Sequence, residues 1–214
     1  MATILIVGAS RGTGLETVRK ALAAGHRVRA LARSAATIPI EDAQLERITG
    51  DATDRTALLN ALEGVDAVIV TLGVAPSIST TLSGTSLFSS ATRALVDTMK
   101  EKGVNRLVAI TGIGAGDSRG HGGPLYDWVA FPLLLKRVYD DKDVQEQIIR
   151  QSGLEWTIVR PGILTNGPTT GRYRALLDPA QWRADQISRA DVADFLVKEV
   201  TERKFVHQAP VLLG

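Results

Sequence analysis

A glycine-rich segment near the start of the chain has the spacing of a phosphate-binding turn. It reads Gly8-Ala9-Ser10-Arg11-Gly12-Thr13-Gly14 and directly follows a short apolar run. Gly8 permits a tight turn, Gly12 allows a phosphate to approach closely, and Gly14 lets the next helix pack near a strand. Backbone N–H groups and the positive end of that helix can then meet a pyrophosphate. Since strand, loop, helix and second strand follow in order, the segment predicts dinucleotide binding.

Two arginines are placed to contact the adenosine ribose of such a cofactor. The second expected strand ends at Leu31-Ala32-Arg33-Ser34, where NAD-binding proteins carry an acidic residue for the ribose hydroxyls. No acidic residue follows until Glu41, and Arg11 supplies a second cation from the glycine loop. Two guanidinium groups can hold a 2′-phosphate through charge-assisted bonds. The pattern predicts NADP(H) over NAD(H); the alternative is that both arginines are solvated surface residues.

The ends of the later strands supply further candidate contacts. Asp51 follows the third strand and is the candidate acceptor for the adenine amino group, whereas Asp54 stands where the N-cap of the next helix belongs. The segment Thr71-Leu72-Gly73, at the end of the fourth strand, offers a small backbone surface beside the ribose and phosphates of the cofactor. The predicted cofactor-binding residues of this half are Gly8, Ser10, Arg11, Gly12, Thr13, Gly14, Arg33, Ser34, Asp51, Ala52, Thr71, Leu72 and Gly73.

Short β-rich apolar runs alternate with segments of helical period, which predicts a parallel sheet buried on both faces. The expected strands are Thr3–Val7, Arg27–Ala32, Gln44–Thr49, Asp66–Thr71, Asn105–Thr111, Glu155–Arg160 and a possible short seventh at Pro210–Leu213. The expected helices are Gly12–Ala24, Asp54–Leu62, Ser86–Lys102, Lys136–Gln151 and Arg189–Thr201. Right-handed crossovers then give an α/β, Rossmann-like, doubly wound sheet in the order 3-2-1-4-5-6, with ligands at the carboxyl ends of the strands. Two segments, 112–127 and 162–184, break this rhythm and overhang the predicted site.

Composition limits the class of protein. The 214 residues are 44% apolar and 22% charged, which predicts one folded domain over residues 1–214. A net charge of +2 is too small to predict a nucleic-acid partner, and we expect no metal. Because the chain has no cysteine, redox chemistry needs a bound cofactor. No apolar run reaches the length of a membrane-spanning helix and no basic region precedes the first strand, so we expect a soluble, cytoplasmic monomer or homodimer without a membrane partner.

The chain resembles the atypical, NAD(P)H-binding branch of the short-chain dehydrogenase/reductase superfamily, which includes NmrA-like proteins and the biliverdin reductase B, or flavin reductase, type. The resemblance covers nearly the whole length. It rests on the glycine loop and on the segments Gly50–Asp54, Ser152–Gly162 and Ile187–Ala193. It implies NADPH-dependent reduction of a flavin-, quinone- or tetrapyrrole-like acceptor or, in NmrA-like members, cofactor sensing without turnover.

The resemblance implies a catalytic lysine, but this sequence has no tyrosine four residues before it. The superfamily's usual pair is a tyrosine acid and a lysine four residues later, whose ammonium group lowers the pKa of the phenol. Lys142 matches that lysine, but Val138 occupies the tyrosine position and Tyr139 is one residue off, about 100° around the helix. Tyr126 has Ala130 at the fourth position after it. The usual machinery is therefore predicted to be broken, although Lys142 could still bond the nicotinamide ribose.

Two positions depart from the biliverdin reductase B type. Thr111-Gly112 stands where that type has Thr-Ser, and Gly162 stands where it has a histidine. Both departures disfavour biliverdin itself, but a flavin or quinone can take its proton from water. His121, in the segment over the site, is a candidate proton donor. The predicted catalytic residues are Lys142, Thr111 and His121, and the predicted cofactor-binding residues at the nicotinamide end are Thr111, Lys142, Pro161, Gly162 and Ile163.

The first functional hypothesis is therefore an NADPH-dependent reductase of a planar small-molecule acceptor. The alternative is a non-catalytic NADP(H)-binding sensor of the NmrA-like type, favoured by the missing tyrosine. The acidic residues around Lys142 (Asp140, Asp141 and Asp143) are interpreted as a solvated helix start in preference to a substrate-recognition cluster. Lys142 and Glu146 are spaced for a one-turn ion pair. An apolar patch at 128–135 is interpreted as core or a dimer face, with a wall for a planar acceptor as the alternative.

Overall fold

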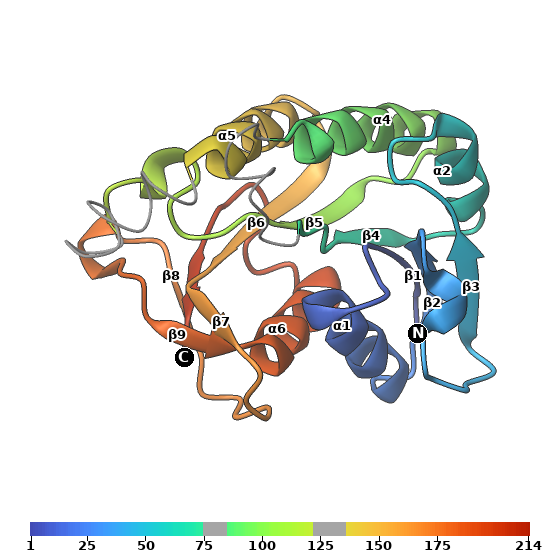
Figure 1. Cartoon of the computed structure of the whole chain (residues 1–214), viewed down its shortest axis with the longest axis horizontal. Coiled ribbons are helices and arrows are strands. Elements are labelled where there is room, and N and C mark those ends of the chain that lie inside the picture. The colour runs from blue at the N-terminus through green and yellow to red at the C-terminus, as the bar shows by residue number, and fades with distance from the viewer. Residues whose placement is uncertain (75–84, 122–135) are drawn as a thin grey trace.

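The computed structural model describes residues 1–74, 85–121 and 136–214. Within these ranges one mixed sheet lies between two layers of helices (Figure 1). Its strands are β1 (Thr3–Val7), β2 (Arg27–Ala32), β3 (Leu45–Thr49), β4 (Ala67–Val70), β5 (Arg106–Ile110), β6 (Glu155–Pro161), β8 (Arg174–Leu176) and β10 (Val211–Leu213). The helices are α1 (Gly12–Ala23), α2 (Arg55–Ala61), α4 (Leu87–Lys102), α5 (Lys136–Arg150) and α6 (Arg189–Glu202).

The order of the strands confirms the predicted Rossmann-like topology. It is β3-β2-β1-β4-β5-β6-β10-β8, so the first six strands stand in the order 3-2-1-4-5-6. The expected seventh strand is β10, which pairs in parallel with β6. The parallel strands β3, β2, β1, β4, β5, β6 and β10 therefore have their carboxyl ends at the same edge of the sheet. Ligands of such folds bind at this edge.

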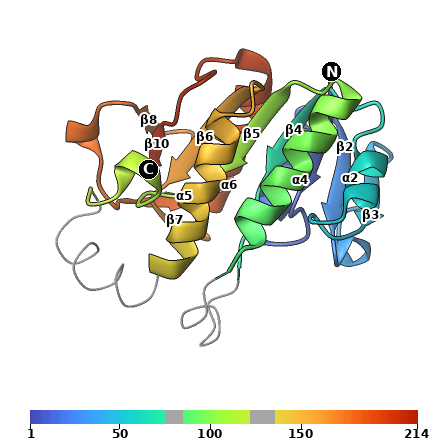
Figure 2. The same ribbon diagram turned by 90° about the horizontal axis from the view of Figure 1, so that it is seen from above.

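Each face of the sheet has its own buried core, because successive side chains of a strand point to opposite faces. In β1, Ile4 and Ile6 belong to the core packed against α1 and α6, whereas Leu5 and Val7 belong to the core packed against α2 and α4. Figure 2 shows α2, α4 and α5 lying side by side over the second face. These four side chains are fully buried or nearly so, as expected for a parallel sheet covered by helices on both faces.

The segment after β6 contains structure that the sequence pattern did not predict. β8 pairs antiparallel with β10, and a second, two-stranded sheet joins β7 (Ile163–Thr165) to β9 (Gln186–Ser188). The strands β7, β8 and β9, which were not predicted, have three residues each, too few for an alternating pattern to be recognised. No helix among the described residues is long and apolar enough to cross a membrane. Tyr126, the apolar patch at 128–135 and the end of the 112–127 segment lie outside the described residues.

Candidate functional site

The glycine loop has the geometry that its sequence predicts. Gly8 has a φ of +90°, and its N–H donates to the Leu31 carbonyl at 2.9 Å, which ties the loop to the end of β2. A Cβ built on Gly14 would collide with the Gly8 carbonyl oxygen and would lie 2.7 Å from the Thr71 hydroxyl. The first turn of α1 therefore packs directly on the ends of β1 and β4, and only glycine fits at position 14.

The start of α1 differs from the starts of two other helices. Asp54 caps α2 by accepting from the Thr56 N–H at 2.8 Å, which confirms its predicted role. Ser188 caps α6 by accepting from the Asp191 N–H at 2.9 Å. The N-cap of α1 is Arg11, whose backbone is extended and whose side chain accepts no bond from the helix. Within residues 1–74, 85–121 and 136–214, no side chain accepts from the first N–H groups of α1, which suits a phosphate at this position.

The residues predicted to surround the adenosine ribose come together at the ends of β1, β2 and β3. The Ser34 hydroxyl donates to the Ser10 hydroxyl at 2.9 Å and so joins the first two loops. Arg11 and Arg33 are exposed beside them. Asp51 accepts from the Thr53 N–H and hydroxyl at 2.8 and 2.7 Å, and these bonds lower the pKa of its carboxyl. Asp51 is therefore a charged acceptor, and its contact with adenine stays a prediction.

Lys142 lies buried against the end of β5. Its Nζ donates to the Thr111 carbonyl and lies 4.8 Å from the centre of the Phe88 ring. Burial lowers the pKa of the Lys142 ammonium to about 8, against the attraction of Glu146 and Asp141, which raises it. The Thr111 hydroxyl is itself engaged, because it donates to Glu146 at 2.8 Å. Thr111 therefore holds Lys142 through its carbonyl oxygen.

Tyr139, one residue from the expected tyrosine position, nevertheless lies beside this lysine. Lys142 Nζ lies 5.6 Å from the centre of the Tyr139 ring. Three residues turn a helix by about 300°, so the two side chains are only about 60° apart around α5 and share a face. A methyl group built on Gly112 would lie 2.6 Å from the Tyr139 hydroxyl. The glycine at the end of β5 thus makes room for this hydroxyl, which a strict four-residue spacing rule overlooks.

Glu146 does not form the predicted ion pair with Lys142. Both its carboxylate oxygens accept from Arg160 on β6, at 2.9 Å from Nε and 2.6 Å from Nη2. Arg160 is fully buried and also pairs with Asp117. The pair links α5 to the sheet directly beside Thr111, and sequence reasoning missed it because the partners come together only through the tertiary fold.

Removing the Glu146 carboxylate should be strongly destabilising. Among the described residues, Glu146→Ala leaves Arg160 with Asp117 as its one ion-pair partner and the Thr111 hydroxyl without an acceptor. Breaking a buried pair in this way costs about 3–5 kcal/mol. Urea denaturation measures the loss. The control is Glu101→Ala on α4, whose carboxylate pairs with Arg55 at the exposed surface and is worth about 1 kcal/mol or less. Equal losses for the two variants would contradict a structural role for the Glu146–Arg160 pair.

The acidic residues around Lys142 are not a plain solvated helix start. Asp141 is buried and accepts from the Phe88 N–H at 2.9 Å, so it supplies the N-terminal cap of α4. Asp140 and Asp143 both pair with Arg119.

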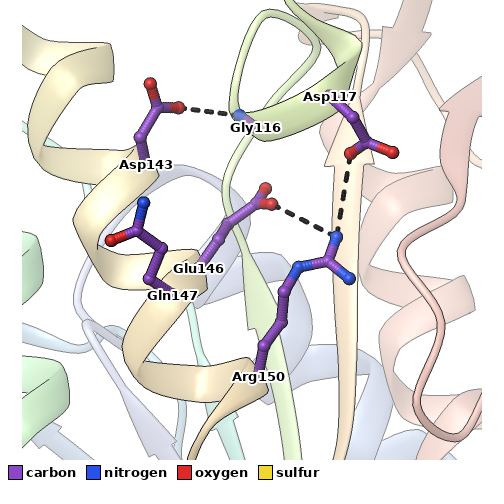
Figure 3. A pocket seen from close by; sticks show the side chains of 6 residues that line it. All are labelled: Gly116, Asp117, Asp143, Glu146, Gln147 and Arg150. Carbon is purple, nitrogen blue, oxygen red and sulfur yellow. Dashed lines mark hydrogen bonds and ion pairs between the residues drawn. The ribbon is translucent and has the colours of Figure 1, made fainter.

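Asp143 also lines a pocket of about 310 Å³, where it accepts from the Gly116 N–H at 2.7 Å (Figure 3). Its other lining residues are Asp117, Glu146, Gln147 and Arg150.

The remaining predicted residues fall into two groups. His121 stacks edge-on against Trp182, 5.3 Å between ring centres, and makes no hydrogen bond to Lys142 or Thr111 in the described part of the chain.

The other group of remaining predicted residues, Pro161, Gly162 and Ile163, lies at the end of β6 and just after it. Pro161 is buried, Ile163 is 46% exposed, and a Cβ on Gly162 would collide with the Asp185 carbonyl oxygen. Gly162 is therefore needed for the close approach of the 162–185 segment, and the roles of all four residues at a cofactor stay predictions.

The comparison with known families agrees with this geometry. A family model described as NAD(P)H-binding matches residues 8–203, from the first glycine of the loop to the end of α6. The chain belongs to this NAD(P)H-binding family. The NAD(P)H-binding part of the predicted resemblance is thereby confirmed.

Several known proteins are similar to the chain in sequence or in structure. It is 30% identical over 195 residues to sterol demethylase protein B of Methylococcus capsulatus, over 85% of this chain and 58% of that protein. It is 29% identical over 160 residues to an NAD(P)H azoreductase of Xenophilus azovorans, over 74% of this chain and 47% of that protein. The solved anaerobilin reductase of Escherichia coli O157:H7 has a TM-score of 0.80 at 26% identity, over 99% of this chain and 96% of that one. The chain thus spans about half the length of the two sequence relatives.

Membership of the NAD(P)H-binding family indicates that the glycine loop binds the pyrophosphate of the cofactor. The uncapped start of α1 and the close packing of Gly14 suit the cofactor's pyrophosphate, and the end of β5 lies two strands along the same sheet edge. A nicotinamide dinucleotide laid along this edge can reach both places. Sequence reasoning found the first place from a local motif and missed the Tyr139–Lys142 contact at the second.

Proposed function

We propose that the chain is an NADPH-dependent reductase that delivers hydride to a flavin-, quinone- or tetrapyrrole-like acceptor. The observation that carries this proposal is that Tyr139 and Lys142 lie together at the end of β5. The glycine loop lies at the same edge of the sheet, at the end of β1. The names of two relatives, an NAD(P)H azoreductase and an anaerobilin reductase, support the direction of the reaction.

The preference for NADPH over NADH is supported by charge. Arg11 and Arg33 flank the bonded pair Ser10–Ser34, where the adenosine ribose of a dinucleotide bound at this loop would lie. Both guanidinium groups are exposed, so they are available to an added phosphate. Their forked donors can hold a 2′-phosphate, whereas the ribose hydroxyls of NADH offer no matching charge.

The residues of the chain then share the work of the reduction. Bound NADPH supplies a hydride. Tyr139 donates the proton from its hydroxyl, and the Lys142 ammonium stabilises the negative charge that this leaves on the phenol oxygen. The Thr111 carbonyl fixes Lys142, and Gly112 leaves space for the Tyr139 hydroxyl. Hydride and proton together reduce the acceptor by two electrons, which suits flavins and quinones.

The proposal is tested by turnover. Purified protein is mixed with NADPH and with FMN, biliverdin or small quinones in turn, and the loss of nicotinamide absorbance is followed. We expect turnover with at least one acceptor, and slower turnover at equal concentration of NADH. Tight NADPH binding without turnover on any acceptor would contradict the proposal and identify the chain as a sensor.

The sensor hypothesis has lost its main support. It rested on the missing tyrosine, and the structure places a tyrosine ring beside Lys142. No observation in the described residues favours it independently. It therefore stands as the outcome that the turnover experiment would reveal.

A further inference from the structure

Arg189 lies against the glycine loop although it is the first residue of α6. A methyl group built on Gly12 would lie 3.7 Å from Arg189 Nε and 3.9 Å from its Cδ. The contact follows from the fold, because α1 and α6 pack side by side on the same face of the sheet (Figure 1). A cation from the far end of the chain is thus placed beside the loop that meets the pyrophosphate.

Most N–H donors of the Arg189 guanidinium group are not engaged by the described residues. Its Nη1 donates to the Asn166 side-chain oxygen at 2.7 Å, just after β7. It makes no other hydrogen bond and no ion pair with the described residues. Asn166 is neutral, so it orients the guanidinium group without balancing its charge. An arginine has five N–H donors in a fixed fork, and most of these are left for a ligand.

The ligand that fits this arrangement is a diphosphate. Gly12 has a φ of +54° and opens α1, whose first N–H groups have no side-chain acceptor in the described part of the chain. Arg189 adds its positive charge beside the positive end of this helix, which is unfavourable unless an anion lies between them. A pyrophosphate laid over Gly12 could accept from the helix on one side and from the guanidinium fork on the other.

We propose that Arg189 is a further cofactor-binding residue, which holds the NAD(P)H pyrophosphate from the side opposite the glycine loop and is positioned by Asn166. The proposal rests on dinucleotide binding at the glycine loop but not on the preference for NADP(H). Arg189 differs in role from Arg11 and Arg33, because the pyrophosphate is common to NADPH and NADH whereas the 2′-phosphate belongs to NADPH alone.

The test compares three ligands by calorimetry on the full chain. In Arg189→Gln, NADPH and NADH should both bind about tenfold to a hundredfold more weakly, by the same factor, because a charge-assisted contact is lost in each. Adenosine 2′-monophosphate has no pyrophosphate, so its dissociation constant should not change. Arg27→Gln removes an exposed arginine at the amino end of β2, away from the loop, and should change none of the three constants.

Each other outcome counts against the role of Arg189. Unchanged binding of NADPH and NADH would overturn it, as would equal weakening of adenosine 2′-monophosphate, and a loss confined to NADPH would move Arg189 to the 2′-phosphate. Equal affinities of the wild type for NADPH and NADH would remove the proposed cofactor preference and leave the Arg189 result readable. A wild type that binds neither would overturn both proposals.

Two further variants keep the test readable if Arg189→Gln folds poorly. Arg189→Lys retains the charge at the start of α6 but loses the fork, and should weaken NADPH and NADH equally by a smaller factor. Asn166→Ala frees the guanidinium group from its orienting bond and should also weaken the two dinucleotides equally. If neither variant weakened them, Arg189 would have no part in binding the pyrophosphate.

Discussion

Tyr139→Phe is expected to lower kcat about a hundredfold or more on an acceptor that must be protonated, because the variant loses only the hydroxyl that supplies the proton. The ring remains beside Lys142 and the dissociation constant of NADPH should be unchanged. Steady-state kinetics and calorimetry measure the two quantities. The control is Tyr173→Phe, whose hydroxyl donates to Asp194 on α6 and should not affect turnover.

The pH dependence of the rate tests the partner of Tyr139. The pKa of Lys142 is about 8, so its ammonium group is charged below pH 8 and neutral above it. Because the charged form is the one that stabilises the phenol oxygen, kcat should fall as the pH rises through about 8. In Lys142→Met the rate should be low and this fall should be absent. A variant that keeps the same falling limb, or Tyr139→Phe with full activity, would remove the pair from the reaction.

Replacing Arg11 and Arg33 together with alanine should abolish the preference for NADPH. Each single change should weaken NADPH about tenfold, and the double change about a hundredfold, because each removes one charge-assisted contact at an exposed and partly screened position. The dissociation constant of NADH should stay the same, since it has no 2′-phosphate. Calorimetry at fixed ionic strength measures both constants.

The control and the contrary result for this prediction are simple. Arg27→Ala makes the same change of charge at the other end of β2 and should leave NADPH binding unchanged. If the double variant bound NADPH as the wild type does, Arg11 and Arg33 would be solvated surface residues without a role in cofactor choice.

The parts of the molecule that follow from local sequence could be predicted. The glycine loop is set by sterics within a few residues, as the collision of a Gly14 Cβ with the Gly8 carbonyl shows. The strands β1, β4 and β5 are mostly apolar runs that are almost fully buried. All six strands from β1 to β6 lie within one residue of their predicted bounds. Asp54 caps α2 through a bond only two residues away, so its role is also visible in the sequence.

The parts that depend on distant partners could not be predicted. Asp141 caps α4 across 53 residues of sequence, and Arg160 reaches Glu146 only because β6 lies beside β5 under α5. The contact of Arg189 with Gly12 needs α6 to return beside α1. Tyr139 is a different case, because its neighbourhood to Lys142 is local. Three-residue spacing brings two side chains to one helix face as four-residue spacing does, so the spacing of Tyr139 and Lys142 on α5 by itself indicates their contact.

A crystal structure of the protein with NADP⁺ bound tests the central claim most directly. It should show the pyrophosphate over Gly12–Gly14, the 2′-phosphate within hydrogen-bond distance of Arg11 and Arg33, and the nicotinamide beside Tyr139 at the end of β5. A nucleotide whose 2′-phosphate contacts neither arginine, or whose nicotinamide lies away from β5, would contradict the account.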